Sequence, residues 1–181
     1  MRFLLDTSSS FTWVPNNRCF GCKARPHFIR GLSDTWVEGD GKTIKLVYPQ
    51  GYLFGSMGSD SLQLSDDSVF KARLMYVTQK ETKAFAGYRS DGVIGLMPKG
   101  ANMPILRQMK EEGLIEKEIF SLSLAGWNDA VGKSKIWFGG YSYHALRQFH
   151  GDTNLTNRAL EGLIQWNPIA KDELYWAFKP T

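Results

Sequence analysis

Short apolar segments punctuated by glycine run along most of this 181-residue chain, and they constrain its fold more than any other feature. Turn residues, and not regular helices, separate these segments, which is typical of an all-β domain with orthogonal or layered sheets. A content of 43% apolar residues is enough to bury a core. The expected strands are residues 2–5, 11–14, 43–48, 52–64, 70–77, 92–96, 119–124, 135–138 and 163–169.

The fold class we expect is mainly β, with one or two short helices. Residues 104–112 begin with a proline, which suits a first helical position, and are followed by Gly113, a common helix stop. A second, shorter helical turn fits residues 142–147. Residues 149–161 are predicted to form an inserted surface loop, whose N-L-T sequon makes Asn154 a glycosylation candidate.

Charge and hydropathy argue against several classes of partner. The formal net charge is +4, but the lysines and arginines are scattered and interleaved with acidic residues. That pattern is typical of a solvated surface, so we expect no nucleic-acid partner. No apolar run approaches the ~18 residues of a membrane span, and the start of the chain, MRFLLD, reaches a carboxylate too soon for a signal peptide. We therefore expect no membrane span and no signal peptide in this chain.

Asp6 ends the first apolar segment and is followed by small hydroxyl residues, in the stretch FLLDTSSSFTWVP. An aspartate at the end of an apolar strand can lie at the floor of a cleft, where backbone N–H groups and the Ser9 hydroxyl bond its carboxylate. The same pattern is common for a plain turn or cap residue. Taken alone, this stretch leaves both interpretations open.

Ordered blocks along the chain resemble the N-terminal lobe of the pepsin-like aspartic proteases, peptidase family A1. Residues 3–22 resemble the catalytic turn of that family, D-T-G-S-S, followed by W-V-P and a small cysteine loop. Residues 46–64 resemble the flap hairpin, and SDGVIGL at 90–96 resembles the segment beneath the catalytic turn. Residues 113–124 resemble a helix exit with its following strand, and residues 136–146 resemble the next strand. Residues 163–178 resemble the crossing between the two lobes.

The resemblance implies a single lobe of the bilobal pepsin-like acid protease fold. The lobe would cover residues 1–165 and an interlobe crossing residues 166–181, with the C-terminal lobe absent from this chain. The implied function is that of an aspartic-type endopeptidase, in which water is activated between two aspartates. Two are needed because like charges a few ångströms apart cannot both ionise, so the pair offers a base and an acid together. The implied substrate is an extended peptide or protein, and no cofactor is expected.

Roles carry over onto the residues that match the family motifs. Asp6 would be the one catalytic aspartate that this chain supplies. Thr7 would hydrogen-bond to the matching turn of the other lobe, and Ser9 would bond the outer oxygen of Asp6. The family's glycine after Asp-Thr is Ser8 here, which adds a side chain where a backbone approaches closely.

The flap block supplies the remaining expected site residues. Tyr48 corresponds to the flap tyrosine, whose hydroxyl would meet the indole N–H of Trp13. Gly51 and Tyr52 would contact an extended substrate through the main chain. Pro49 replaces the usual flap glycine and removes one N–H donor. Without the resemblance, Trp13 would be a core aromatic and Tyr48 a cross-strand packing residue.

Cys19 and Cys22 fit a small disulfide, which would indicate an oxidising compartment more than it would add stability. Their spacing also matches a redox C-x-x-C motif, but no βαβ pattern surrounds it. A zinc site with His27 lacks a fourth ligand nearby, and His144 and His150 show no partner spacing. We therefore expect a disulfide and no metal.

A second catalytic turn is missing from the sequence. The other Asp-Thr pairs, at residues 34–35 and 152–153, follow no apolar strand. Catalysis would therefore need a second lobe, a second copy or a larger assembly that covers the missing half. The alternatives are a non-catalytic pepsin-like subunit or peptide-binding pseudoprotease within a larger assembly, and a fragment of a longer product. By family resemblance the protein would be secreted or vacuolar/lysosomal.

Overall fold

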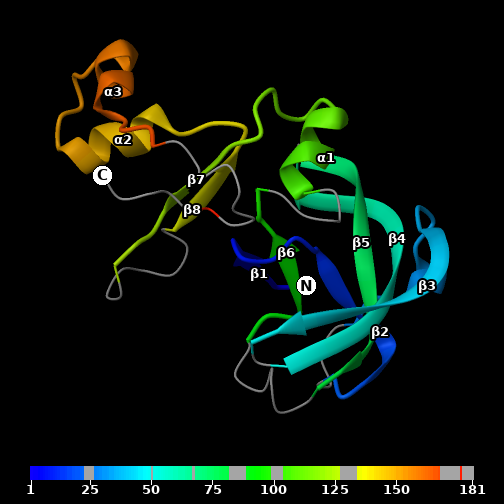
Figure 1. Ribbon diagram of the computed structural model, residues 1–181. Coiled ribbons are helices and arrows are strands. Elements are labelled where there is room, and N and C mark those ends of the chain that lie inside the picture. Colours follow the sequence, from blue (N-terminus) through cyan, green and yellow to red (C-terminus); the bar gives the residue numbers. More distant parts are fainter. Residues whose placement is uncertain are drawn as a thin grey trace.

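The computed structural model describes residues 1–22, 27–49, 51–66, 68–81, 89–98, 104–126, 134–167 and 176. Figure 1 shows a curled sheet that makes up most of the molecule, with a small hairpin and a pair of helices extending beyond it. Strands dominate the described residues, so the prediction of a mainly β fold is confirmed.

The large sheet has six strands in the spatial order β1-β6-β2-β5-β4-β3. Its strands are β1 (Phe3–Asp6), β2 (Trp13–Phe20), β3 (Val37–Tyr48), β4 (Gly51–Ser65), β5 (Ser68–Lys80) and β6 (Gly92–Gly95). Strand β1 pairs in parallel with β6, β2 pairs in parallel with β5, and β3, β4 and β5 form an antiparallel meander. A second sheet consists of the hairpin β7 (Phe120–Ser123) and β8 (Lys135–Phe138).

Three predicted strands differ from the observed ones by more than three residues. The strand predicted at residues 11–14 is β2, which runs from Trp13 to Phe20. Strand β3 begins at Val37 and not at residue 43, because the polar residues after Val37 pair with β4 through their backbone around a bulge between Glu38 and Thr43. Such residues show no apolar alternation, so periodicity does not find them. The prediction of a strand at 163–169 is wrong over residues 163–167, where a helix ends and irregular chain follows; residues 168–169 lie outside the described residues.

The described residues contain three α-helices, one more than the sequence predicted: α1 (Ile105–Glu111), α2 (Tyr143–His150) and α3 (Asn157–Leu163), together with the 3-10 turn η1 (Arg30–Leu32). The predicted stop of α1 is confirmed. Gly113 has φ +76°, a conformation that glycine adopts without strain, and its N–H donates to the Lys110 carbonyl.

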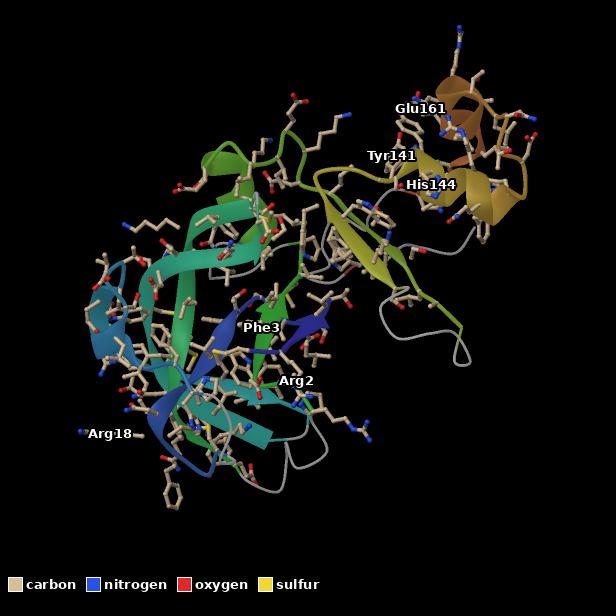
Figure 2. All side chains as sticks on the ribbon, turned by 180° about the vertical axis from the view of Figure 1, so that it is seen from behind. Arg2, Phe3, Arg18, Tyr141, His144 and Glu161 are labelled. Carbon is tan, nitrogen blue, oxygen red and sulfur yellow. A yellow bond between two sulfur atoms is a disulfide. The ribbon has the colours of Figure 1, made fainter. Side chains whose placement is uncertain are left out.

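Helices α2 and α3 occupy much of the region predicted as a surface loop. Side-chain caps explain them, since Ser142 accepts from the Ala145 N–H and Thr156 accepts from the Ala159 N–H, each at 3.2 Å. Figure 2 shows His144 of α2 and Glu161 of α3, with Tyr141 just before α2, away from the large sheet.

The hydrophobic core lies against both faces of β5. Phe70 and Ala72 pack under the apolar face of α1, whereas Met75 and Val77 pack against Trp13 on the other side. Burying side chains of this kind contributes about 1.5–3 kcal/mol for each large residue, so this packing holds β5, β6 and α1 as one unit. That unit forms the support on which the turn after β1 rests.

Candidate active site

Asp6 is the last residue of β1, and the end of β6 lies directly beneath its turn. The Leu96 N–H donates to the Asp6 carbonyl at 2.8 Å, and the Met97 N–H donates to the Ser9 carbonyl at 3.1 Å. A Cβ added to Gly95 would lie 2.6 Å from the Ser9 carbonyl oxygen, which is closer than real Cβ atoms come. The segment GVIG therefore packs beneath the turn, as the sequence predicted.

One oxygen of the Asp6 carboxylate is held by Ser8. Oδ1 accepts the Ser8 backbone N–H at 2.9 Å and the Ser8 hydroxyl at 2.6 Å. The predicted bond from Ser9 to this carboxylate is replaced by the one from Ser8, because the buried Ser9 hydroxyl points elsewhere. Ser8 is exposed and Asp6 half-buried, so the carboxylate is oriented at the protein surface.

The Ser9 hydroxyl instead connects the turn to the end of β3. It donates to the Phe11 carbonyl at 3.0 Å and lies 3.0 Å from the Tyr48 hydroxyl. The Tyr48 hydroxyl also accepts from Trp13 Nε1 at 3.1 Å, which is the contact that the sequence predicted. Trp13 is only 2% exposed, so this link joins the hairpin tip to the core.

The β3–β4 hairpin reverses directly after Tyr48, which pairs with Gly51. Gly51 has φ +141°, a conformation that other residues rarely adopt. The Tyr52 ring packs edge-on against Phe54, with the Lys45 ammonium 4.9 Å from its centre, and the Tyr52 carbonyl accepts from a neighbouring N–H. Substrate contacts by Gly51 and Tyr52 remain predictions.

The other aspartate–threonine pairs lie outside this site. The Thr35 hydroxyl donates to Asp60, a buried carboxylate in β4 that also accepts from Ser33 at 2.9 Å. The pair at 152–153 lies in the turn between α2 and α3. In the described ranges, the hydrogen-bond donor to the Asp6 carboxylate is Ser8. Thr7 is exposed, and its contact with another lobe remains a prediction.

Cys19 and Cys22 form the expected disulfide, with an S–S distance of 2.03 Å. Among the described residues, no group of three or more histidine, cysteine or acidic side chains could hold a metal ion. No helix in the described part of the chain is long and apolar enough to cross a membrane. Asn154 is exposed between α2 and α3, and its glycosylation remains a prediction.

Comparison with known proteins decides the family. A family model described as eukaryotic aspartyl protease matches residues 1–179. The chain belongs to this family. As a eukaryotic aspartyl protease family member it has the single-lobe, mainly β fold that the ordered sequence blocks predicted.

Relatives in this family are similar over most of the chain. Procardosin-B of Cynara cardunculus is 28% identical over 86% of this chain and 32% of its own length. Cathepsin E of Mus musculus is 28% identical over 96% of the chain and 41% of its own length. Vacuolar protease A of Aspergillus fumigatus is 30% identical over 77% of the chain and 36% of its own length. The chain thus spans less than half the length of these relatives.

Sequence reasoning missed Ser8 as the donor to Asp6. A signal was present, because an aspartate commonly accepts the N–H two residues further on, forming a local turn. Because Ser8 stands where the family has glycine, the resemblance predicts a steric effect of its side chain and not a hydrogen bond from its hydroxyl.

Proposed function

We propose that this chain supplies one half of an aspartic endopeptidase, whose catalytic water lies between Asp6 and a second aspartate from another lobe. The observation that supports the proposal is the hydrogen-bonded link from Ser9 through Tyr48 to Trp13. This link holds a β-hairpin against the turn that carries Asp6, an arrangement suited to enclosing an extended peptide above the carboxylate.

The chemistry follows from the requirement for one base and one acid. Ser8 donates twice to Oδ1, and no described residue donates to Asp6 Oδ2, so the lone pairs of Oδ2 can accept a water. The ionised carboxylate takes a proton from this water as its oxygen attacks the peptide carbonyl carbon, while the protonated partner donates to the carbonyl oxygen. As the C–N bond breaks, Asp6 gives its proton to the leaving amine, and one hydroxyl of the tetrahedral intermediate returns its proton to the partner carboxylate. The pair then again holds one proton.

The substrate in this proposal is an extended polypeptide, bound through its main chain beneath the hairpin formed by β3 and β4. The same proposal places the protein in a vacuolar or secretory compartment. The Cys19–Cys22 disulfide favours an oxidising environment, and one family relative is named vacuolar protease A.

The test joins the chain to a second Asp-bearing lobe and measures cleavage of a denatured protein between about pH 3 and pH 5, where a carboxyl pair holds one proton. We expect cleavage that a hydroxyl-bearing transition-state analogue inhibits. D6N should abolish it, whereas D34N, at an exposed aspartate of another Asp-Thr pair, should not. Equal activity of D6N and wild type would disprove the proposal.

A second candidate is a pseudoprotease that binds peptides without cutting them. Ser8 favours it, because its hydroxyl lies 2.6 Å from Asp6 Oδ1, next to where a water would approach. In this case the two-lobe protein binds a labelled peptide but leaves it intact, and S8G confers cleavage. Cleavage by the unmodified two-lobe protein would exclude this candidate.

A further inference from the structure

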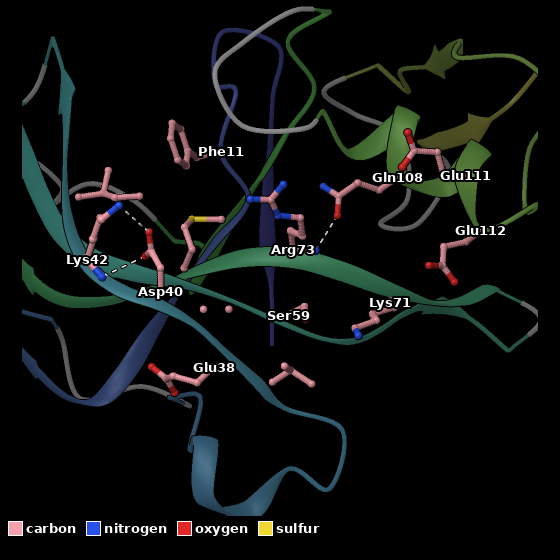
Figure 3. A pocket seen from close by; sticks show the side chains of 15 residues that line it. Phe11, Glu38, Asp40, Lys42, Ser59, Lys71, Arg73, Gln108, Glu111 and Glu112 are labelled. Atoms are coloured by element: carbon pink, nitrogen blue, oxygen red, sulfur yellow. Dashed lines mark hydrogen bonds and ion pairs between the residues drawn. The ribbon is translucent and has the colours of Figure 1, made fainter.

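A groove of about 800 Å³ opens beside the candidate active site. Its floor is the β4–β5 pair, where Ser59 faces Arg73 in register and Lys71 lies two residues earlier on the same face. Helix α1 forms one wall and the β3 bulge the other (Figure 3). Its volume lies within the range of ligand-binding pockets.

Phe11 joins this groove to the Asp6 turn. It lines the groove together with Ile44 and Met57, and its carbonyl accepts the Ser9 hydroxyl at 3.0 Å. Ile44 belongs to the same hairpin strand as Tyr48. An extended chain leaving the candidate active site on this side therefore meets an apolar entrance before it reaches the polar part of the groove.

Several charges in the groove already have partners. Asp40 and Lys42 form an ion pair at 3.3 Å. Glu38 accepts from the Tyr76 hydroxyl and from Arg30, and these hydrogen bonds lower the pKa of Glu38. These groups neutralise one another on the β3 side of the groove.

Lys71 and Arg73, unlike these charges, have no ion-pair partner among the described residues. Both side chains are exposed, and no ion pair or side-chain hydrogen bond involves either of them in the part of the chain that the structure describes. The Arg73 N–H donates to Gln108 Oε1 at 2.5 Å, which ties this stretch of β5 to α1. Glu111 and Glu112 line the α1 wall, so the groove has a cationic floor beside an acidic wall.

The spacing of the two cations matches that of an extended ligand. Side chains two residues apart on a strand lie on one face, roughly 6.6–6.8 Å apart. Carboxylates at alternate positions of an extended peptide can therefore each face one cation, Lys71 or Arg73. The acidic wall favours this orientation, because it repels carboxylates that point toward α1.

We propose that this groove is a second peptide-binding site, which takes an extended segment with acidic residues at alternate positions and pairs them with Lys71 and Arg73. The segment is a continuation of the polypeptide bound at Asp6, and to that extent the inference rests on the proposed function. The inference adds a substrate class, namely proteins that have an acidic stretch to one side of the peptide bond that is cleaved.

The test measures binding of fluorescein-labelled peptides to the full chain by anisotropy. One peptide has the sequence Leu-Val-Gly-Asp-Gly-Asp-Gly, the second has the two aspartates adjacent, and the third has asparagine in their place. We expect the first to bind about tenfold more tightly than the third, from two exposed ion pairs, with the second in between. Added salt should reduce the difference.

Matched variants locate the site. K71E/R73E should remove the preference for aspartate, and K117E/R158E, which makes the same charge change at exposed residues outside the groove, should keep it. K71Q/R73Q gives a second, milder variant, and circular dichroism checks that each is folded. Equal affinity for all three peptides, no binding, or an undiminished preference in K71Q/R73Q would overturn the inference.

This result is separable from the proposed function, because binding requires no cleavage. D6N should retain the preference for aspartate. A two-lobe protein that cuts peptides without any preference for acidic stretches would refute the groove site and leave the catalytic proposal intact.

Discussion

Ser8 and Ser9 are adjacent in the sequence, yet their hydroxyl groups bind different partners. The exposed Ser8 donates to the Asp6 carboxylate, whereas the buried Ser9 bonds the Tyr48 hydroxyl. The orientation of the carboxylate and the position of the hairpin are therefore set by separate hydrogen bonds, which substitutions can remove one at a time.

S8A removes the hydroxyl that donates to Asp6 Oδ1. We expect the free energy of unfolding at pH 7 to fall by about 1 kcal/mol, since a hydrogen bond to a carboxylate is lost at an exposed position. Urea unfolding of S8A and wild type measures this difference in the free energy of unfolding. S8T should retain the stability, and S10A, at a neighbouring hydroxyl without such a bond in the described residues, should change it little. Equal stability of S8A and S10A would contradict this role.

Y48F removes the acceptor of the Trp13 indole N–H and the partner of Ser9, while the ring remains. We expect a loss of about 2 kcal/mol in the free energy of unfolding, from two hydrogen bonds in a partly buried site. Y52F is the matched control, because it removes a hydroxyl from the next tyrosine of the same hairpin. If both variants were equally stable, the link would not hold the hairpin.

At the level of elements, the close contact between β6 and the turn after β1 depends on the absence of a side chain at Gly95. A Cβ there would approach the Ser9 carbonyl to 2.6 Å and the Phe11 carbonyl to 2.7 Å. Neither oxygen belongs to a flexible side chain, so the turn itself must move.

G95A should therefore lower the free energy of unfolding by about 2 kcal/mol or more, through displacement of backbone that packs on β6. Thermal unfolding followed by circular dichroism measures this change. G140A is the control, since a Cβ there meets no atom within 4 Å and its φ is not positive. Similar melting temperatures for the two variants would argue against the close approach.

Strand β3 is linked to its neighbours by a carboxylate whose contribution depends on pH. Hydrogen bonds from Tyr76, Trp36 and Arg30 hold the pKa of Glu38 below its ordinary value of 4.5. A depressed carboxyl pKa stabilises the fold above the unfolded-state value, and this stabilisation is lost as the pH falls through the folded-state value.

E38Q should accordingly be less stable than wild type at pH 7, and this difference in melting temperature should disappear as the pH falls below about 4.5. Calorimetry across this range measures it. E116Q, at an exposed glutamate, should match wild type throughout. A difference between E38Q and wild type that stays constant with pH would show that charge is not the cause.

Taken as a whole, the molecule presents one candidate catalytic carboxylate, whereas the proposed chemistry needs two. We expect the 181-residue chain alone to give no inhibitor-sensitive cleavage of a denatured protein at acid pH, because one carboxyl group cannot be base and acid to the same water. Gel filtration beside the assay identifies the species present. Inhibitor-sensitive cleavage by a monomer, abolished in D6N, would contradict this expectation.

Much of the fold could be predicted because its signals are local. The strand at β8, the helix α1 with its stop at Gly113, and the segment ending at Gly95 all follow from neighbouring residues. The beginning of β3 and helix α3 were missed for the opposite reason. The beginning of β3 is defined by backbone pairing with β4, which is not a local signal. Helix α3 has the composition of a loop, although Thr156 caps it.

The sequence by itself determined the β architecture, the turn at Asp6 and, through family resemblance, the contact of Tyr48 with Trp13. Only the tertiary structure decided that Ser8 and not Ser9 donates to Asp6, and that Lys71 and Arg73 face a groove without carboxylate partners among the described residues. The physical reason is distance along the chain. Ser9 meets a hydroxyl 39 residues away, and such pairings are set by how the strands pack.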